Sequence, residues 1–275
     1  MKEFILGLLL YILPKRWISL LTGKLVHTEL PKAINKKAKA WFVNRYKIDM
    51  SEAEFDLDHY PHIGAVFTRR LKEGLRPIKG LFVHPADARL TAIQDINSDT
   101  LIQAKGKNYQ LSKFLNTQSW QEFEGGKSLT YYLCPTDYHR VHSPVTGEIT
   151  SVHYIPGTLW PVNDWSVKSI NNLFAVNERV VVWYKTPKGR VAVVLVGATN
   201  VGKMSLSFDK NIVTNQSFIK PKDQLKTYDS PISIKAGDEL GVFHMGSTVI
   251  CVYPKDFLPE ITTPLGSATK VGVSV

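Results

Sequence analysis

Cysteine is scarce in this chain of 275 residues. Cys134 and Cys251 are its only cysteines. Neither belongs to a CxxC pair or to a Cys/His cluster with the spacing of a zinc finger. This scarcity argues against a disulfide framework and against a structural metal, and it fits a protein of a reducing compartment.

Long apolar runs and nucleotide-binding motifs are also missing. Residues 4–13 are almost entirely apolar, but Pro14 ends the run, and a helix needs about 20 apolar residues to cross a bilayer. A signal peptide is disfavoured because Glu3 weakens the basic start, no small-x-small cleavage site follows, and Lys15 and Arg16 come directly after the run. No GxGxxG or GxxxxGK follows a strand pattern, so a nucleotide-binding fold is not supported.

Acidic residues are outnumbered by basic ones, which gives a net charge of +10 and a pI of about 9.4. Such a charge favours an anionic partner, either nucleic acid or an acidic membrane surface. The aromatic residues form no RNP or OB-fold signature, and the basic residues gather on amphipathic helical patterns. Charge alone cannot separate the two partners, but these residue patterns favour a membrane surface over nucleic acid.

Two amphipathic helices are expected near the N-terminus, one after Pro14 and one from Pro31, which suits a first helical turn. Their apolar faces are Trp17, Leu20, Leu21 and Leu25 in the first, and Ile34, Ala38, Trp41 and Phe42 in the second, opposite Lys32, Lys36, Lys37 and Lys39. Lysine and tryptophan on short helices are typical of helices that lie in a membrane interface. The alternative is that the helices pack on the domain and the lysines simply face water.

The rest of the chain predicts one further helix, Tyr60–Lys72, with Arg69, Arg70 and Lys72 facing outward, and then strands. The expected strands are Leu81–Val83, Arg89–Ile93, Leu101–Ala104, Leu129–Leu133, Glu148–Tyr154, Val180–Tyr184, Val191–Val196, Val201–Leu206 and an apolar stretch over residues 240–253. Their spacing is typical of an antiparallel sandwich or barrel. We therefore expect a predominantly β, α+β protein, with a helical membrane-associating region (1–75) and a β-rich catalytic domain (76–275).

Three groups of polar residues are candidates for chemistry. His139 and His142 lie three residues apart beside Arg140, and histidine has a pKa suited to proton transfer near neutrality. Packed histidines or a metal pair are the alternatives, although no further metal ligands are evident. Asp87 lies in a tight turn, where a carboxylate more often caps its own backbone.

The third group, Gly246-Ser247-Thr248, interrupts the apolar stretch over residues 240–253. Glycine inside a strand often marks a bulge or a close approach of another group. A serine hydroxyl there can attack the preceding carbonyl if a base removes its proton. On its own, however, a Gly-Ser-Thr sequence is ordinary turn chemistry.

Together, the segments 85–87, 137–142 and 246–248 resemble the phosphatidylserine decarboxylases, which depend on a pyruvoyl group. The resemblance extends over nearly the whole chain, through residues 11–14, 101–106, 171–179 and 196–202. Two positions depart from the family pattern. Met245 replaces a leucine, and Ala88 replaces a glycine, so that Ala88 must adopt a negative φ or bear strain. A second Gly-Ser pair ending at Ser267 lacks the threonine and a surrounding strand.

The resemblance implies that the chain cuts itself between Gly246 and Ser247 into a β chain, 1–246, and an α chain, 247–275. His142, oriented by Asp87, would take the proton of Ser247, and Ser247 would become the pyruvoyl cofactor. That group would form a Schiff base with phosphatidylserine, and CO2 and phosphatidylethanolamine would leave. His139 is then expected to act as the general acid. No metal is expected.

The resemblance also implies where the protein acts. We expect a peripheral protein on the cytoplasmic face of the inner membrane, bound to phosphatidylserine and to an anionic surface. A homodimer is left open, and no nucleic-acid partner is expected. The alternatives are a decarboxylase of a related serine phospholipid and a lipid-binding homologue that is never processed.

Overall fold

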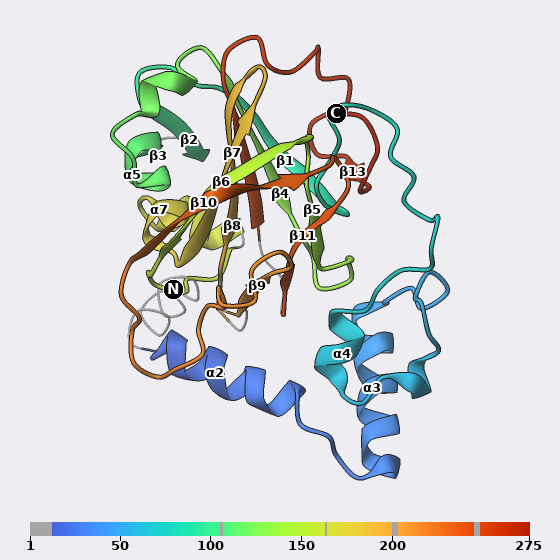
Figure 1. Cartoon of the computed structure of the whole chain (residues 1–275). Helices are drawn as coiled ribbons and strands as arrows, with labels where there is room; N and C mark the ends of the chain where they lie inside the picture. Colours follow the sequence, from blue (N-terminus) through green and yellow to red (C-terminus); the bar gives the residue numbers. More distant parts are fainter. Residues whose placement is uncertain (1–12, 105–106, 163, 200–202, 245–247) are drawn as a thin grey trace.

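The computed structural model describes residues 13–104, 107–162, 164–199, 203–244 and 248–275 (Figure 1). Four helices form the first part of this region, namely α2 (Lys15–Val26), α3 (Lys32–Tyr46), the 3-10 helix η1 (Leu57–His59) and α4 (Ile63–Phe67). Pro14 and Pro31 stand directly before α2 and α3, and Lys47 ends α3 in the left-handed conformation. Within the described ranges, none of the helices is both long and apolar enough to span a bilayer.

Two expectations for this helical part are wrong. The helix predicted over Tyr60–Lys72 covers only Ile63–Phe67, because Leu71 pairs with Ala53 instead of continuing the helix. Arg69 is consequently buried rather than outward. Lys39 is also buried, because the chain after α3 folds back and presents the carbonyls of Leu57 and Tyr60 at 2.8 and 2.6 Å from its ammonium.

The centre of the molecule is an antiparallel sheet of eight strands. In spatial order they are β10 (Gln224–Ile234), β6 (Gly147–Ile155), β7 (Arg179–Thr186), β8 (Gly189–Val196), β12 (Thr248–Tyr253), β4 (Lys127–Tyr132), β1 (Ala88–Asp95) and β13 (Ala268–Thr269). The outer strands β10 and β13 do not pair with each other, so the described strands form no closed barrel. Ala88 begins β1 without a positive φ, so the loss of the family's glycine causes no backbone strain there.

Smaller elements cover this sheet. A second sheet has the order β5 (Arg140–His142), β11 (Glu239–Phe243) and β9 (Met204–Leu206), and a hairpin joins β2 (Thr100–Ala104) to β3 (Lys107–Gln110). The remaining helices are α5 (Leu111–Leu115), η2 (Trp120–Phe123), α6 (Asp164–Ser169) and α7 (Leu173–Val176).

The central strands β7, β8 and β12 are buried on both faces of the sheet, which explains why they are almost continuously apolar, whereas the outer strand β10 is largely exposed. Along β7, Val180 and Val182 belong to one core, which β5-β11-β9 covers, whereas Val181 and Trp183 belong to the other. Helices α5 and α7 and the β2–β3 hairpin cover that second core. The expected predominantly β, α+β class is confirmed, but the helical cover departs from a simple two-sheet sandwich.

The apolar stretch over residues 240–253 is two strands in two different sheets. β11 lies in the middle of the three-stranded sheet, and β12 lies between β8 and β4 in the large one. The segment between Phe243 and Thr248 therefore passes from one sheet to the other. The predicted cleavage site lies in this crossing.

Candidate active site

The predicted cleavage residues Gly246 and Ser247, with Met245, lie outside the described residues, but both sides of the segment are anchored. On one side, the Phe243 amide donates to the carbonyl of His139 at 3.0 Å. On the other, the buried Thr248 pairs with Tyr132 of β4 and Val196 of β8. The segment is therefore tied at one end to His139, whereas His142 lies opposite Glu239 further back on β11.

His139 lies at the end of a tight turn that Asp137 closes by accepting from the Cys134 amide at 2.7 Å. Its ring is fully buried against Phe67, with 3.8 Å between ring centroids. His139 Nδ1 lies 2.8 Å from the Asp137 carbonyl. Because a carbonyl can only accept, Nδ1 carries the proton and Nε2 of the neutral ring has a free lone pair. Burial lowers the pKa of His139 to about 3 and so favours that neutral ring.

His142 shows the same tautomer on β5. Its Nδ1 donates to the Gly237 carbonyl at 2.7 Å, and its Nε2 accepts from the Tyr138 hydroxyl at 3.2 Å. Burial lowers the pKa of His142, and the hydrogen bond to Gly237 opposes that shift only in part. Both histidines are therefore neutral near pH 7, with Nε2 able to take a proton.

Asp87 is held by cations rather than by a histidine. Arg76 donates to both of its carboxylate oxygens, at 2.6 Å for the shortest contact, and Lys270 and the Val271 amide add bonds of 3.1 and 2.9 Å. Burial disfavours the charged carboxylate, but these hydrogen bonds outweigh it, so the pKa of Asp87 lies below its ordinary value. Asp87 is ionised in an ion-pair cluster that also contains Glu52, whose carboxylate accepts from Arg76 at 2.6 Å.

The expected hydrogen bond from Asp87 to His142 does not occur among the described contacts, because the Gly237 carbonyl occupies Nδ1 of the histidine. The two residues are instead linked through the backbone, where the His142 amide donates to the Pro85 carbonyl at 2.7 Å. The charge of Asp87 still favours a protonated His142 electrostatically. Asp87 can thus stabilise the imidazolium that forms when His142 takes a proton.

Sequence reasoning missed Arg76, Lys270 and Gly237. A buried carboxylate requires a cation, which predicts that Asp87 has a basic partner but not which one. Arg76 is 11 residues from Asp87 and Lys270 is 183 residues away, so no local spacing marks either. The carbonyl of Gly237 carries no side-chain signal at all.

The ion-pair cluster gives a stability prediction for Asp87→Asn. The amide removes the buried charge that faces Arg76 and Lys270 and leaves the partly exposed Glu52 as their remaining partner. Removing one partner of a buried ion pair costs about 3 kcal/mol or more in the free energy of unfolding. The measurement is urea unfolding in a Ser247→Ala background, so that cleavage does not alter the result. Asp95→Asn is the control, because the Asp95–Lys127 pair is exposed and should contribute below about 1 kcal/mol. Equal losses in the two variants would contradict the buried-cluster role.

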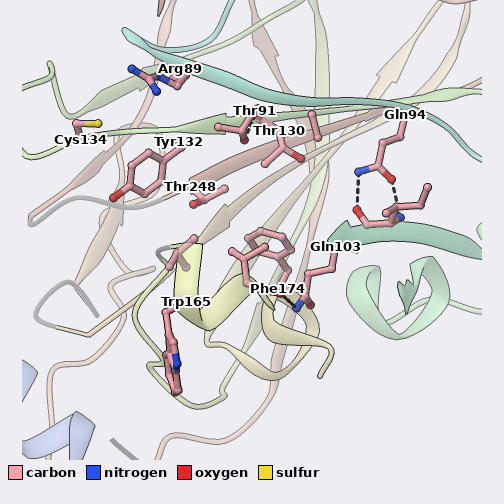
Figure 2. A pocket seen from close by; sticks show the side chains of 14 residues that line it. Arg89, Thr91, Gln94, Gln103, Thr130, Tyr132, Cys134, Trp165, Phe174 and Thr248 are labelled. Atoms are coloured by element: carbon pink, nitrogen blue, oxygen red, sulfur yellow. Dashed lines mark hydrogen bonds between the residues drawn. The ribbon is translucent and has the colours of Figure 1, made fainter. Parts of the chain in front are cut away.

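A cavity of about 720 Å³ reaches the first described residue after Ser247 (Figure 2). Thr130, Tyr132 and Thr248 line it from the sheet, with Trp165 of α6 and Phe174 of α7 across from them. The Thr248 hydroxyl is buried and has no hydrogen-bond partner among the described residues. Arg89 is the one charged residue of the described lining. The cavity therefore suits an anionic polar group held near residue 247.

Comparisons with known proteins agree with this arrangement. The sequence profile described as phosphatidylserine decarboxylase matches residues 63–275. The chain is 39% identical to the phosphatidylserine decarboxylase proenzyme of Myxococcus xanthus over 249 residues, which is 89% of this chain and 88% of that protein. It is 41% identical to the proenzyme of the same name from Anaeromyxobacter over 249 residues, which is 89% and 87% of the two chains. It is 39% identical to the proenzyme of the same name from Shewanella sediminis over 262 residues, which is 91% of this chain and 89% of that protein. The chain belongs to the phosphatidylserine decarboxylase family.

Proposed function

We propose that this protein is a phosphatidylserine decarboxylase that matures by cutting itself between Gly246 and Ser247 and then releases CO2 from phosphatidylserine to give phosphatidylethanolamine. The observation that carries the proposal is the pair of neutral histidines whose Nδ1 is protonated, His139 fully buried and His142 half-buried, together with the hydrogen bond that joins His139 to the Phe243 end of the Gly246–Ser247 segment. Family membership supports the same reaction.

In the proposed maturation, His142 Nε2 takes the proton of the Ser247 hydroxyl. The hydroxyl oxygen attacks the Gly246 carbonyl carbon, the peptide C–N bond breaks, and the acyl group moves to oxygen. Loss of the Ser247 α-proton then expels the chain ending at Gly246 as a carboxylate. The dehydroalanine left at 247 takes up water and loses ammonia, which leaves a pyruvoyl group. Asp87 supports the charge on His142 through space.

The surroundings of residue 247 fit a pyruvoyl group. The Thr248 hydroxyl, which has no hydrogen-bond partner among the described residues, and the cavity lie directly beside that position. A pyruvoyl group supplies the electron sink that decarboxylation of an amino acid requires and that unmodified side chains lack. In the proposal, Arg89 binds the acidic head group in the cavity. His139 delivers the proton that replaces CO2 on the α-carbon. Because burial lowers the pKa of His139 to about 3 in the described structure, this role requires that substrate binding first raise that pKa.

The lowered pKa of His142 predicts how self-cleavage depends on pH. The base must be neutral, and burial makes its protonation harder than that of a free histidine. The cleavage rate should therefore stay constant from pH 8 to below pH 6.5, the ordinary histidine pKa, and fall only at lower pH. The rate is read from gel time courses of freshly synthesised precursor at each pH. A fall that already begins above pH 6.5 would contradict His142 as the base.

Intact-mass spectrometry of the purified protein tests the proposed function. A fragment of residues 247–275 that begins with pyruvoyl, together with CO2 release from phosphatidylserine, is the expected result. A single chain of 31.0 kDa that stays inactive after prolonged incubation would support a lipid-binding homologue that is never processed. Cleavage without turnover of phosphatidylserine would favour a related serine phospholipid as substrate.

We further infer a peripheral protein on the cytoplasmic face of the inner membrane, with residues 1–75 as its membrane-associating part and residues 76–275 as its catalytic part. Trp17, Leu21 and Leu25, spaced four residues apart on α2, are 52%, 57% and 68% exposed, which supports this inference. Leu20, expected on the same face, is instead buried. The homodimer stays a prediction.

A further inference from the structure

The segment between β9 and β10 exposes large apolar side chains where a soluble surface would carry polar ones. Ile219 is 79% exposed and Phe218 is 36% exposed, and the neighbouring Lys220 and Lys222 are exposed as well. Nothing in the family resemblance or in the catalytic geometry uses these residues. Adjacent exposed apolar side chains flanked by lysines are typical of an interaction surface when they form part of a larger apolar patch.

This segment lies against the exposed face of α2, although about 200 residues separate them along the sequence (Figure 1). The rings of Trp17 and Phe218 are 4.4 Å apart between centroids, and the Lys24 ammonium lies 5.3 Å from the Phe218 ring. The result is one apolar surface built from two segments, which we call the α2–loop face. It consists of Trp17, Leu21, Leu25, Phe218 and Ile219.

The α2–loop face is fixed to the catalytic part of the molecule. Arg16, at the start of α2, donates to Asn215 at 3.2 Å and forms an ion pair with Glu178, which is fully buried directly before β7. Asn215 itself is buried and precedes the exposed segment. Arg16 therefore links the helix, the segment and the sheet.

We propose that the α2–loop face is the surface that enters an anionic membrane, with residues 218–222 as a second contact beside helix α2. Tryptophan, phenylalanine and aliphatic side chains flanked by lysines match the apolar boundary and the anionic head groups of such a surface. The net charge of +10 also attracts the whole protein to an anionic surface at long range. The inference rests on the proposed function, whose substrate is a lipid.

The test is flotation of the purified protein with vesicles of phosphatidylcholine and phosphatidylglycerol, which are not substrates. The double variant Phe218→Ser/Ile219→Ser should bind about tenfold more weakly than the wild type, because two apolar side chains no longer leave water. Lys220→Ala and Lys222→Ala should each weaken binding about fivefold on these vesicles, with no effect on pure phosphatidylcholine. Leu81→Ser is the matched control, because Leu81 is 81% exposed but lies outside the face.

Self-cleavage and CO2 release in detergent micelles identify a variant that has not folded. If the double variant does not fold, the single variant Ile219→Ser is tested instead, because a change at a largely exposed side chain should not disturb folding. Unchanged flotation of Ile219→Ser and of the double variant would overturn the proposal. The proposal would also be overturned if these variants lost a dimer but still floated with vesicles, because the face would then bind a second copy of the chain. Absence of CO2 release by the wild type in detergent would instead refute the proposed function and leave the flotation result standing.

Discussion

Replacing Ser247 by alanine is expected to leave one chain of 31.0 kDa that releases no CO2 from phosphatidylserine. Alanine has no hydroxyl to attack the Gly246 carbonyl, so neither the ester nor the pyruvoyl group can form. The expected loss is complete rather than partial, since no other group in the chain replaces the electron sink. Denaturing gels and intact mass report the cleavage, and CO2 release reports the activity.

Ser267→Ala is the matched control, because Ser267 follows the other Gly-Ser pair of the C-terminal region. Its hydroxyl donates to the Pro264 carbonyl at 2.7 Å, and its carbonyl accepts from the Leu90 amide, which are the contacts of a structural turn. This variant should be cleaved and active like the wild type. An intact Ser267→Ala chain beside a cleaved, active Ser247→Ala chain would move the cleavage site to Ser267.

Replacing the two histidines by glutamine should separate maturation from turnover. His142→Gln removes the proposed base, so the chain should stay uncleaved. His139→Gln should still mature, but its decarboxylation rate should fall about 10²–10⁴-fold, the usual contribution of a positioned general acid. Gel time courses follow the first step, and single-turnover CO2 release by the matured protein follows the second.

His153→Gln is the control for the loss of a buried histidine. His153 is buried and bonded to Asp223 at 2.6 Å, on β6 and outside the proposed catalytic group. It should leave both steps close to wild type, because glutamine can also donate to Asp223. If His139→Gln stays uncleaved while His142→Gln matures normally, the two histidines exchange roles.

The central β strands could be predicted because burial on both faces makes them continuously apolar. β7 and β8 were expected within two residues at each end, whereas the stretch 81–83 proved to contain isolated bridges rather than a strand. The strands β3, β5, β10 and β13 were not expected. That the stretch over residues 240–253 belongs to two sheets could not be read from the sequence. An apolar run shows that a strand is buried, but not which strands it pairs with.

The candidate site, like the fold, could be predicted from the sequence only in part. The local motif around His139 and His142 identified a candidate base and acid, because histidine chemistry depends on residue type. The tautomers depend on the carbonyls of Asp137 and Gly237, which any residue could supply. The ion-pair cluster around Asp87 depends on contacts between distant segments, and Lys39 and Arg69 were misplaced for the same reason.

The position of β12 has a consequence for how the matured molecule assembles. β12 is hydrogen-bonded on both edges, to β4 and β8, and β13 and Lys270 attach the end of the same α chain to β1 and Asp87. Cutting the chain before residue 247 therefore removes a covalent link without removing a strand of the sheet. If the proposed cleavage occurs, the precursor folds as one chain, whereas the matured protein, once unfolded, would have to reassemble from two chains. Its refolding would then be second order and would weaken on dilution.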